Sequence, residues 1–138
     1  MLKVQKIVEL KTNYSFEAPI ITTERNIPLK DKVQGLLDLN SYLTPIPENH
    51  YLVRVSGESM INEGIYNGDI LVVNKKELPK DGKVVIAALN GEMAVKTYRT
   101  IEGTVYLFSA NEKFLPIEIK PFWEFKIQGV VKHVIHSV

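Results

Sequence analysis

Short apolar runs separated by turn residues fill the chain from Tyr51 to its C-terminus. Runs of this length, rich in β-branched and aromatic residues and bounded by glycine, asparagine or aspartate, are typical of β-strands. The predicted strands are YLVRV (51–55), GDILVVN (68–74), KDGKVVIAAL (80–89), EMAVKTYRT (92–100), TVYLFSAN (104–111), FLPIEI (114–119) and FKIQGVVKHVIHSV (125–138). Strands this short and this closely spaced predict a mostly β fold with an antiparallel, partly closed sheet or barrel.

Three local signals refine this prediction. Asn90-Gly91 is a strong signal for a two-residue hairpin turn, and a second turn is expected around Glu102-Gly103. Gly129 interrupts the last apolar run, where a glycine often marks a β-bulge. The run 68–74 is mostly apolar, which predicts a strand that is buried on both of its faces.

The first fifty residues have a different pattern, because they hold four of the seven prolines, at positions 19, 28, 45 and 47. Residues 29–43 carry side chains at helical spacing, and the two later prolines would end a helix there. The residues on the predicted helical face are Val33, Leu36, Leu37 and Asn40. We therefore expect one short helix before the first strand of the β region.

The segment before this helix is polar, rich in β-branched residues and interrupted by proline. This composition predicts an extended arm with a short strand at residues 3–11. The chain is therefore expected to consist of an extended N-terminal arm, residues 1–28, and a β domain, residues 29–138.

Composition and charge restrict the possible functions. The 138 residues, 45% of them hydrophobic, suit one globular domain, and the absence of cysteine removes disulfides and thiolate metal sites. A net charge of +1 is no basic footprint, so we expect no sequence-specific DNA binding. Charged residues interrupt the N-terminus, and no run approaches the ~18 apolar residues of a membrane span. We expect a soluble, cytoplasmic protein with no membrane contact, no metal and no cofactor.

A serine lies in the glycine-rich segment VRVSGESMINEGIYNGD, which follows an apolar strand. Ser59 is a candidate nucleophile there, but a serine hydroxyl needs a base within hydrogen-bond reach. His133 and His136 lie in the last strand with no acidic residue close in sequence to orient them. The pattern therefore does not indicate a Ser-His-Asp triad.

Lys96 is the better candidate base. It follows the Asn90-Gly91 turn among apolar residues, and a lysine can act as a base only when desolvation makes it neutral. From spacing alone, Ser59 is more often a turn serine, and Lys96 is more often a lysine on the solvent face of an amphipathic strand. Both interpretations remain open at this point.

Taken together, SGESMINEGIYNGDILVV and GKVVIAALNGEMAVKTY resemble the LexA/UmuD family of self-cleaving Ser-Lys peptidases, which are S24-like. The shared features are a Ser-Met pair, a Gly-Asp dipeptide that opens a strand, an alternating VVIAAL strand and a Val-Lys pair, with an interval of 37 residues from Ser59 to Lys96. The resemblance extends from about Asp38 to Val138. The stretch LDLNSYL and the proline-containing segment after it look more like UmuD than like a LexA repressor. The resemblance implies the fold of the LexA/UmuD C-terminal domain.

The same resemblance implies roles for particular residues. Ser59 would be the nucleophile of a Ser-Lys dyad, Lys96 the neutral general base, and the backbone N–H of Met60 a donor to the oxyanion. Family members cleave their own chain upstream of the core, commonly between a small residue and a glycine. By its distance from Ser59, that bond would fall near Thr23, Glu24 and Arg25.

A UmuD-like protein would be a homodimer that a RecA filament stimulates to cleave itself. It would act in the SOS response to DNA damage as the accessory subunit of an error-prone, Y-family (UmuC-like) translesion DNA polymerase. The residues before the core leave room for one predicted helix, so we expect no helix-turn-helix domain that binds an operator.

The sequence also bears on three functions other than self-cleavage. The arm lacks the usual Ala-Gly or Cys-Gly bond, so the alternative is a non-cleaving dimeric interaction module of the same fold. Signal peptidase shares a Ser-Lys arrangement but would need a membrane anchor. A general serine hydrolase has no support, because no G-x-S-x-G elbow surrounds Ser59.

Overall fold

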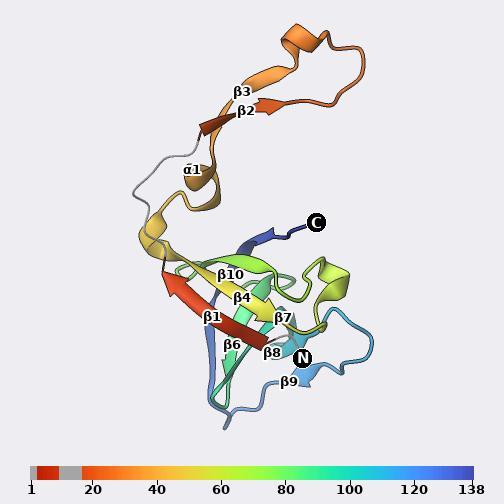
Figure 1. The fold of residues 1–138 in the computed structure, drawn as a ribbon. Coiled ribbons are helices and arrows are strands. Elements are labelled where there is room, and N and C mark those ends of the chain that lie inside the picture. The colour runs from red at the N-terminus through yellow and green to blue at the C-terminus, as the bar shows by residue number, and fades with distance from the viewer. Residues whose placement is uncertain (1–2, 10–16) are drawn as a thin grey trace.

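An eight-stranded sheet and a separate two-stranded hairpin make up most of the protein (Figure 1). The computed structural model describes residues 3–9 and 17–138. The strands, in chain order, are β1 Lys3–Glu9, β2 Glu17–Ile21, β3 Val33–Asp38, β4 His50–Ser56, β5 Ile70–Asn74, β6 Val84–Leu89, β7 Glu92–Ile101, β8 Thr104–Phe108, β9 Ile117–Glu118 and β10 Phe125–Ile135. The helical elements among the described residues are α1 Leu39–Leu43 and the 3-10 turns η1 Leu29–Asp31, η2 Pro47–Asn49 and η3 Ile61–Glu63.

Neighbouring strands of the large sheet are antiparallel and follow the order β1-β4-β5-β10-β6-β7-β8-β9. One further residue pair, Lys3 with Ala94, joins β1 to β7, so the sheet curls back toward itself. A single pair is not a continuous ladder, and the sheet does not close into a barrel. The predicted mostly β fold with an antiparallel, partly closed sheet is therefore confirmed.

A strand lies within each segment predicted as one after residue 50, although the prediction at 114–119 is reduced to the two residues of β9. The strand predicted at 3–11 appears as β1 in the large sheet. The last two residues of that predicted strand lie outside the described residues. The bulge predicted at Gly129 is also confirmed, because the pairing of β10 with β6 shifts register between Ile127 and Gly129.

Two tight turns set the register of β6, β7 and β8. The residues of Asn90-Gly91 and Glu102-Gly103 all have positive φ, between 49° and 85°. This is the backbone geometry of two-residue hairpin turns, whose twist matches that of the flanking strands. Across the second turn Thr97 pairs with Phe108. The turns therefore decide which side chains face each other along β7.

Two clusters of buried side chains form the core. The larger cluster contains Tyr51, Val53, Val55, Met60, Ile65, Leu71, Val73, Ile86 and Val95. The second contains Val85, Ala87, Leu107 and Val130. Because β6 supplies residues to both clusters in alternation, both of its faces are buried. In β5, Leu71, Val72 and Val73 are all fully buried, as predicted for a strand covered on both faces.

The helix predicted over residues 29–43 is wrong for most of its length, because Val33–Asp38 forms strand β3. Gly35 has φ 139° and pairs with Ile20 of β2, which is strand and not helix geometry. Val33 and Leu36 of the predicted helical face are exposed, Leu36 by 69%, so no core covers the face that a helix would present. The helix begins only after Asp38, whose Oδ1 accepts the N–H of Asn40 at 3.1 Å as an N-terminal cap.

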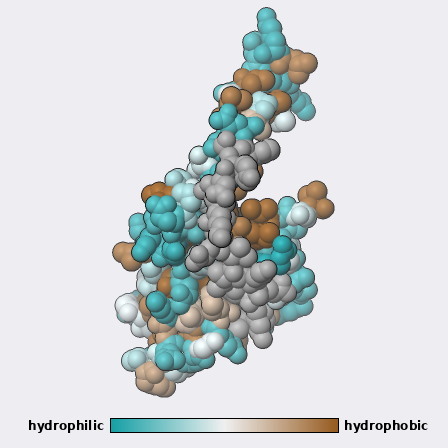
Figure 2. Space-filling model, turned by 60° about the vertical axis from the view of Figure 1, so that its left-hand side comes forward, coloured by the Kyte–Doolittle hydropathy of each residue, from teal (hydrophilic) through white to brown (hydrophobic). Residues whose placement is uncertain are grey.

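The hairpin formed by β2 and β3 stands away from the eight-stranded sheet (Figure 1). Figure 2 shows hydrophobic atoms exposed along this projecting part of the molecule. The exposed large apolar residues of the hairpin are Ile20, Ile21, Leu29, Val33 and Leu36. The predicted boundary between residues 28 and 29 falls in the connection between the two strands, and the division of the chain at that point stays a prediction.

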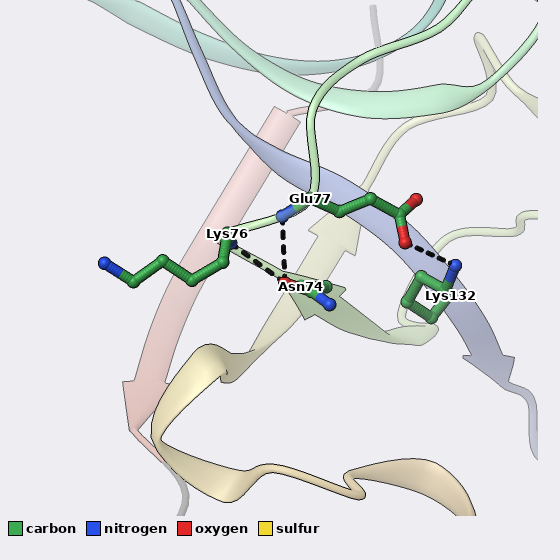
Figure 3. A network of polar contacts seen from close by, with 4 residues as sticks. All are labelled: Asn74, Lys76, Glu77 and Lys132. Carbon is green, nitrogen blue, oxygen red and sulfur yellow. Dashed lines mark hydrogen bonds and ion pairs between the residues drawn. The ribbon is translucent and has the colours of Figure 1, made fainter.

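Polar contacts hold the chain after β5 against β10 (Figure 3). Asn74 Oδ1 accepts the N–H groups of Lys76 and Glu77 at 2.9 and 3.1 Å. Glu77 Oε1 in turn lies 2.7 Å from Lys132 Nζ on β10. Both partners of this ion pair are about one-third exposed, so it contributes at most about 1 kcal/mol. Its role is to order the connection that leads into β6.

Gly129 is needed because another strand passes too close for a side chain. A Cβ at this position would lie 2.5 Å from Cγ1 of Val73 and 2.8 Å from the carbonyl oxygen of Asn74. We expect Gly129→Ala to lower the free energy of unfolding by about 1–3 kcal/mol, because β5 and β10 must move apart. Urea denaturation followed by circular dichroism measures this loss.

Gly103→Ala is the matched control for this substitution. Gly103 also has positive φ, 80°, but a Cβ there meets no atom within 4 Å. Its substitution carries backbone strain alone, of about 1 kcal/mol. Equal losses at the two positions would show that contact with β5 is not the reason for Gly129.

Candidate active site

Ser59 lies in the loop between β4 and β5, and the residue is fully buried. Gly57, two residues earlier, has φ 104°, which favours glycine, and donates its N–H to Asn67 Oδ1 at 3.0 Å. Asp69 closes the loop, because its buried carboxylate accepts the N–H of Tyr66 at 2.8 Å. Ser59 is therefore in a turn, as predicted, but it faces the protein interior.

Lys96 lies within β7 and is only 3% exposed. It pairs with Val85 of β6, and its neighbours Val95 and Thr97 are buried as well. Burial disfavours the ammonium form and lowers the pKa of Lys96 below its ordinary value of 10.5. The interpretation of Lys96 as a lysine on the solvent face of a strand is therefore wrong.

The side chain of Lys96 is hydrogen-bonded to a residue that no motif identifies. Lys96 Nζ donates to Oγ of Ser109 at 2.6 Å. Ser109 follows directly after β8, and the register that pairs Thr97 with Phe108 puts it opposite Lys96. The Glu102-Gly103 turn is the sequence signal that could have found this partner, because a two-residue turn fixes the pairing of the strands it joins.

The two residues after Ser109 contact the loop on both sides of Ser59. The first donates its backbone N–H to the sulfur of Met60 at 3.3 Å. The second, Asn111, donates from Nδ2 to the carbonyl oxygen of Glu58 at 2.9 Å. The strand with the candidate base and the loop with the candidate nucleophile therefore converge on the same short segment.

The side chain of Met60 belongs to the larger core cluster and is fully buried. The backbone carbonyl oxygen of Met60 accepts the N–H groups of Glu63 and Ile65 at 3.0 and 3.2 Å. These contacts hold the backbone of the residue after Ser59 in one orientation. Donation of the Met60 N–H to an oxyanion stays a prediction.

A pocket of about 150 Å³ adjoins Lys96. Its other lining residues are Ala87, Leu89, Glu92, Ala94, Leu107 and Ile117. Because most of these side chains are apolar and the volume is small, the pocket suits a small aliphatic group. Glu92 is the one carboxylate among the lining residues.

Each of the three histidines contacts a residue other than Ser59 and Lys96. His50 Nδ1 lies 2.7 Å from the carbonyl oxygen of Ile46, and the ring of His133 packs 5.4 Å from that of Tyr42. His136 Nδ1 lies 2.7 Å from Oδ1 of Asp69. This last pair joins residues 67 positions apart in the chain, so proximity in sequence does not reveal the carboxylate that orients His136.

The predicted cleavage segment lies apart from these residues. Thr23, Glu24 and Arg25 are all exposed in the connection between β2 and β3. Figure 1 shows this connection at the end of the hairpin that points away from the sheet. The structure therefore brings the Ser59 loop to the Lys96 strand but does not bring this segment to either.

The described part of the chain, residues 3–9 and 17–138, contains no group of three or more His, Cys, Asp or Glu side chains placed to hold a metal ion. Within the same residues, no helix has both the length and the apolar character that crossing a membrane requires.

Comparisons with known proteins agree with the resemblance in the sequence. Residues 16–132 match the model of the family described as Peptidase S24-like. Protein ImpA of Salmonella typhimurium is 38% identical over 117 residues, which cover 79% of this chain and 74% of ImpA. LexA repressor 2 of Pseudomonas putida is 38% identical over 80 residues, and the LexA repressor of Stenotrophomonas maltophilia is 34% identical over 89. These matches cover 58% and 64% of this chain but only 40% and 41% of the two repressors. The chain therefore belongs to the Peptidase S24-like family, the family of LexA and UmuD.

Proposed function

We propose that this protein is a UmuD-like self-cleaving serine peptidase with Ser59 as nucleophile and Lys96 as general base. The observation that supports this most strongly is the buried Lys96, whose strand meets the Ser59 loop at the segment that follows β8. Burying an amine is unfavourable, and shifted pKa values of buried groups are concentrated at functional sites. A catalytic role accounts for a lysine in this position, which packing alone would fill with an apolar residue.

The arrangement suits acyl transfer. Neutral Lys96 takes the proton of the Ser59 hydroxyl while Ser59 Oγ attacks the carbonyl carbon of the scissile peptide bond. The N–H of Met60 donates to the oxyanion, and the Lys96 ammonium then returns its proton to the departing amine. Water hydrolyses the resulting ester with Lys96 again as base, which restores the Ser59 hydroxyl and releases the second fragment.

The proposed substrate is the connection between β2 and β3 of this chain or of a second copy. Peptidases cut exposed chain, and this connection is exposed at residues 23–25. Thr23 has the smallest side chain of the three candidates, and it suits the small pocket beside Lys96 better than Glu24 or Arg25. Cleavage after Thr23 requires the hairpin to leave the position it has in Figure 1.

The wider role that we propose follows the family. LexA repressors are among the relatives, which supports a function connected with the SOS response, and the likeness to ImpA supports the UmuD-like branch. The protein would act in the cytoplasm as a homodimer, cleave itself when a RecA filament binds, and serve as accessory subunit of a UmuC-like translesion polymerase. The exposed apolar residues of the β2–β3 hairpin offer a surface for such a partner.

A second candidate function is a non-cleaving dimeric interaction module. Two observations favour it: residues 23–25 contain no small residue followed by glycine, and the hairpin that carries them lies away from Ser59. In that case the exposed apolar hairpin is the functional surface, and the Ser-Lys pair is inherited without use.

Incubation of the purified protein at alkaline pH, and separately with RecA filaments at neutral pH, distinguishes the two candidates. Self-cleavage predicts two fragments whose masses add up to the intact chain plus one water, with the new ends at or next to Thr23. Intact mass spectrometry over time measures this. A chain that stays whole under both conditions supports the interaction module instead.

A further inference from the structure

Ser109 makes a contact that the proposed mechanism does not use. Its hydroxyl oxygen accepts a hydrogen bond from Lys96 Nζ at 2.6 Å, a short distance for this type of bond. Ser109 is partly buried, and the register of the β7–β8 hairpin holds it opposite Lys96. The contact therefore belongs to the architecture of the sheet and does not depend on a flexible loop.

We propose that Ser109 is a positioning residue for the general base: its hydroxyl holds one N–H of Lys96 so that the remaining face of the amine points to Ser59. This inference rests on the proposed self-cleavage. It makes the candidate site a Ser-Lys-Ser arrangement, in which the third member never bonds to the substrate.

The geometry explains why such a residue is needed. A lysine side chain has four rotatable bonds, and its amine can take a proton only along the direction of its lone pair. One fixed N–H restricts rotation of the terminal group. The residues that follow Ser109 hold Glu58 and Met60 on either side of Ser59, so one segment orients both the base and the loop of the nucleophile.

In this proposal Ser109 also stabilises Lys96 when the amine becomes positively charged. As the proton moves from Ser59 Oγ to Lys96 Nζ, a buried ammonium forms, and its hydrogen bond to Ser109 becomes charge-assisted and stronger. No proton is transferred to or from Ser109. Because the hydroxyl stabilises the charged form, its loss lowers the pKa of Lys96 beyond the decrease that burial already causes.

Two carboxylates belong to described segments around this amine. Burial is the cause of the lowered pKa of Lys96. Glu92 lines the same pocket from β7, and Glu58 lies exposed in the Ser59 loop. From β6 the facing residue is Val85, which carries no charge. The wild type and the Ser109 variants share these surroundings, so a shift in the titration of Lys96 between them reports the change at Ser109.

The test is the pH dependence of self-cleavage in Ser109→Ala, Ser109→Cys and Ser109→Thr. For the alanine and cysteine variants we expect the limiting rate to fall about tenfold to a hundredfold, because the base is misaligned. We also expect the midpoint of the rise in rate to move to lower pH. Threonine keeps the hydroxyl and should restore both values to near the wild type. Thr104→Ala, at the far end of β8, is the control that should change neither.

A second measurement separates this inference from the proposed function. The Lys96 side chain is titrated by NMR of 13C-labelled lysine in the Ser59→Ala background, with the Lys96 signal assigned by its absence in Lys96→Met. A lower midpoint on adding Ser109→Ala supports the positioning role even if the wild-type chain is never cut. An unchanged Lys96 midpoint, or an unchanged limiting rate in a chain that does cleave, overturns it.

Discussion

Ser59→Ala is expected to leave the chain intact under the conditions in which the wild-type protein cuts itself. Alanine has no oxygen to attack the scissile carbonyl, so no acyl intermediate forms. Loss of the nucleophile of a serine peptidase lowers the rate by about a thousandfold or more, and only the contribution of the oxyanion donors remains. Intact mass spectrometry of both proteins over the same period measures the difference.

Ser56→Ala is the matched control, because it removes a hydroxyl three residues away at the end of β4. We expect this variant to be cut at the wild-type rate. The unfolding transitions of both variants should stay close to that of the wild type. Fragments of the wild-type masses from Ser59→Ala would exclude Ser59 as the nucleophile.

Lys96→Met is expected to abolish cleavage and at the same time to stabilise the fold. Methionine has a similar length and no charge, so the variant loses the base but keeps most of the packing. Residues selected for catalysis often carry a stability cost, and removing such a residue commonly adds about 0.5–2 kcal/mol to the free energy of unfolding. Urea denaturation at neutral pH measures the gain.

The stability gained by Lys96→Met should depend on pH. Because burial lowers the pKa of Lys96 in the folded protein, the unfolded chain binds more protons between that lowered pKa and the ordinary value of 10.5. Within this window the free energy of unfolding of the wild type therefore rises with pH. Below the window Lys96 is charged in the folded protein, and the full cost of burying that charge lowers the free energy of unfolding. The gain from Lys96→Met should therefore be largest at neutral pH and shrink as the pH approaches 10.5. The cleavage rate of the wild type should rise with a midpoint below 10.5.

Lys83→Met is the control for this prediction, because Lys83 is exposed just before β6. Its substitution should leave cleavage and its pH profile as they are and change stability little. A Lys96→Met protein that is less stable than the wild type at neutral pH would contradict the claim that the amine is buried at a cost.

Much of the β region is predictable from local pattern. The strands after residue 50 are short apolar runs, and the glycines of Asn90-Gly91 and Glu102-Gly103 mark the turns between them. The bulge at Gly129 follows from the same kind of signal. These features depend on a few neighbouring residues, which is why the sequence is sufficient to predict them.

The helix predicted over 29–43 fails for the opposite reason. Its periodicity is real, but periodicity predicts a helix only if a core covers the apolar face, and Val33 and Leu36 are exposed. Pairing with β2 satisfies the backbone of this segment instead. Whether a distant strand is available for pairing is a property of the whole chain.

The sequence alone determined the order of strands and turns, and the resemblance pointed to Ser59 and Lys96 as a pair. Only the tertiary structure decided that Lys96 is buried, that Ser109 is its hydrogen-bond partner and that Asp69 pairs with His136. The physical reason is that strand and turn preferences act over a few residues. The burial of Lys96 and the pairing of Asp69 with His136 depend on segments that are distant in the chain and meet only in the folded sheet. The β7–β8 turn places Ser109 opposite Lys96, but the direction of the Lys96 amine depends on that burial.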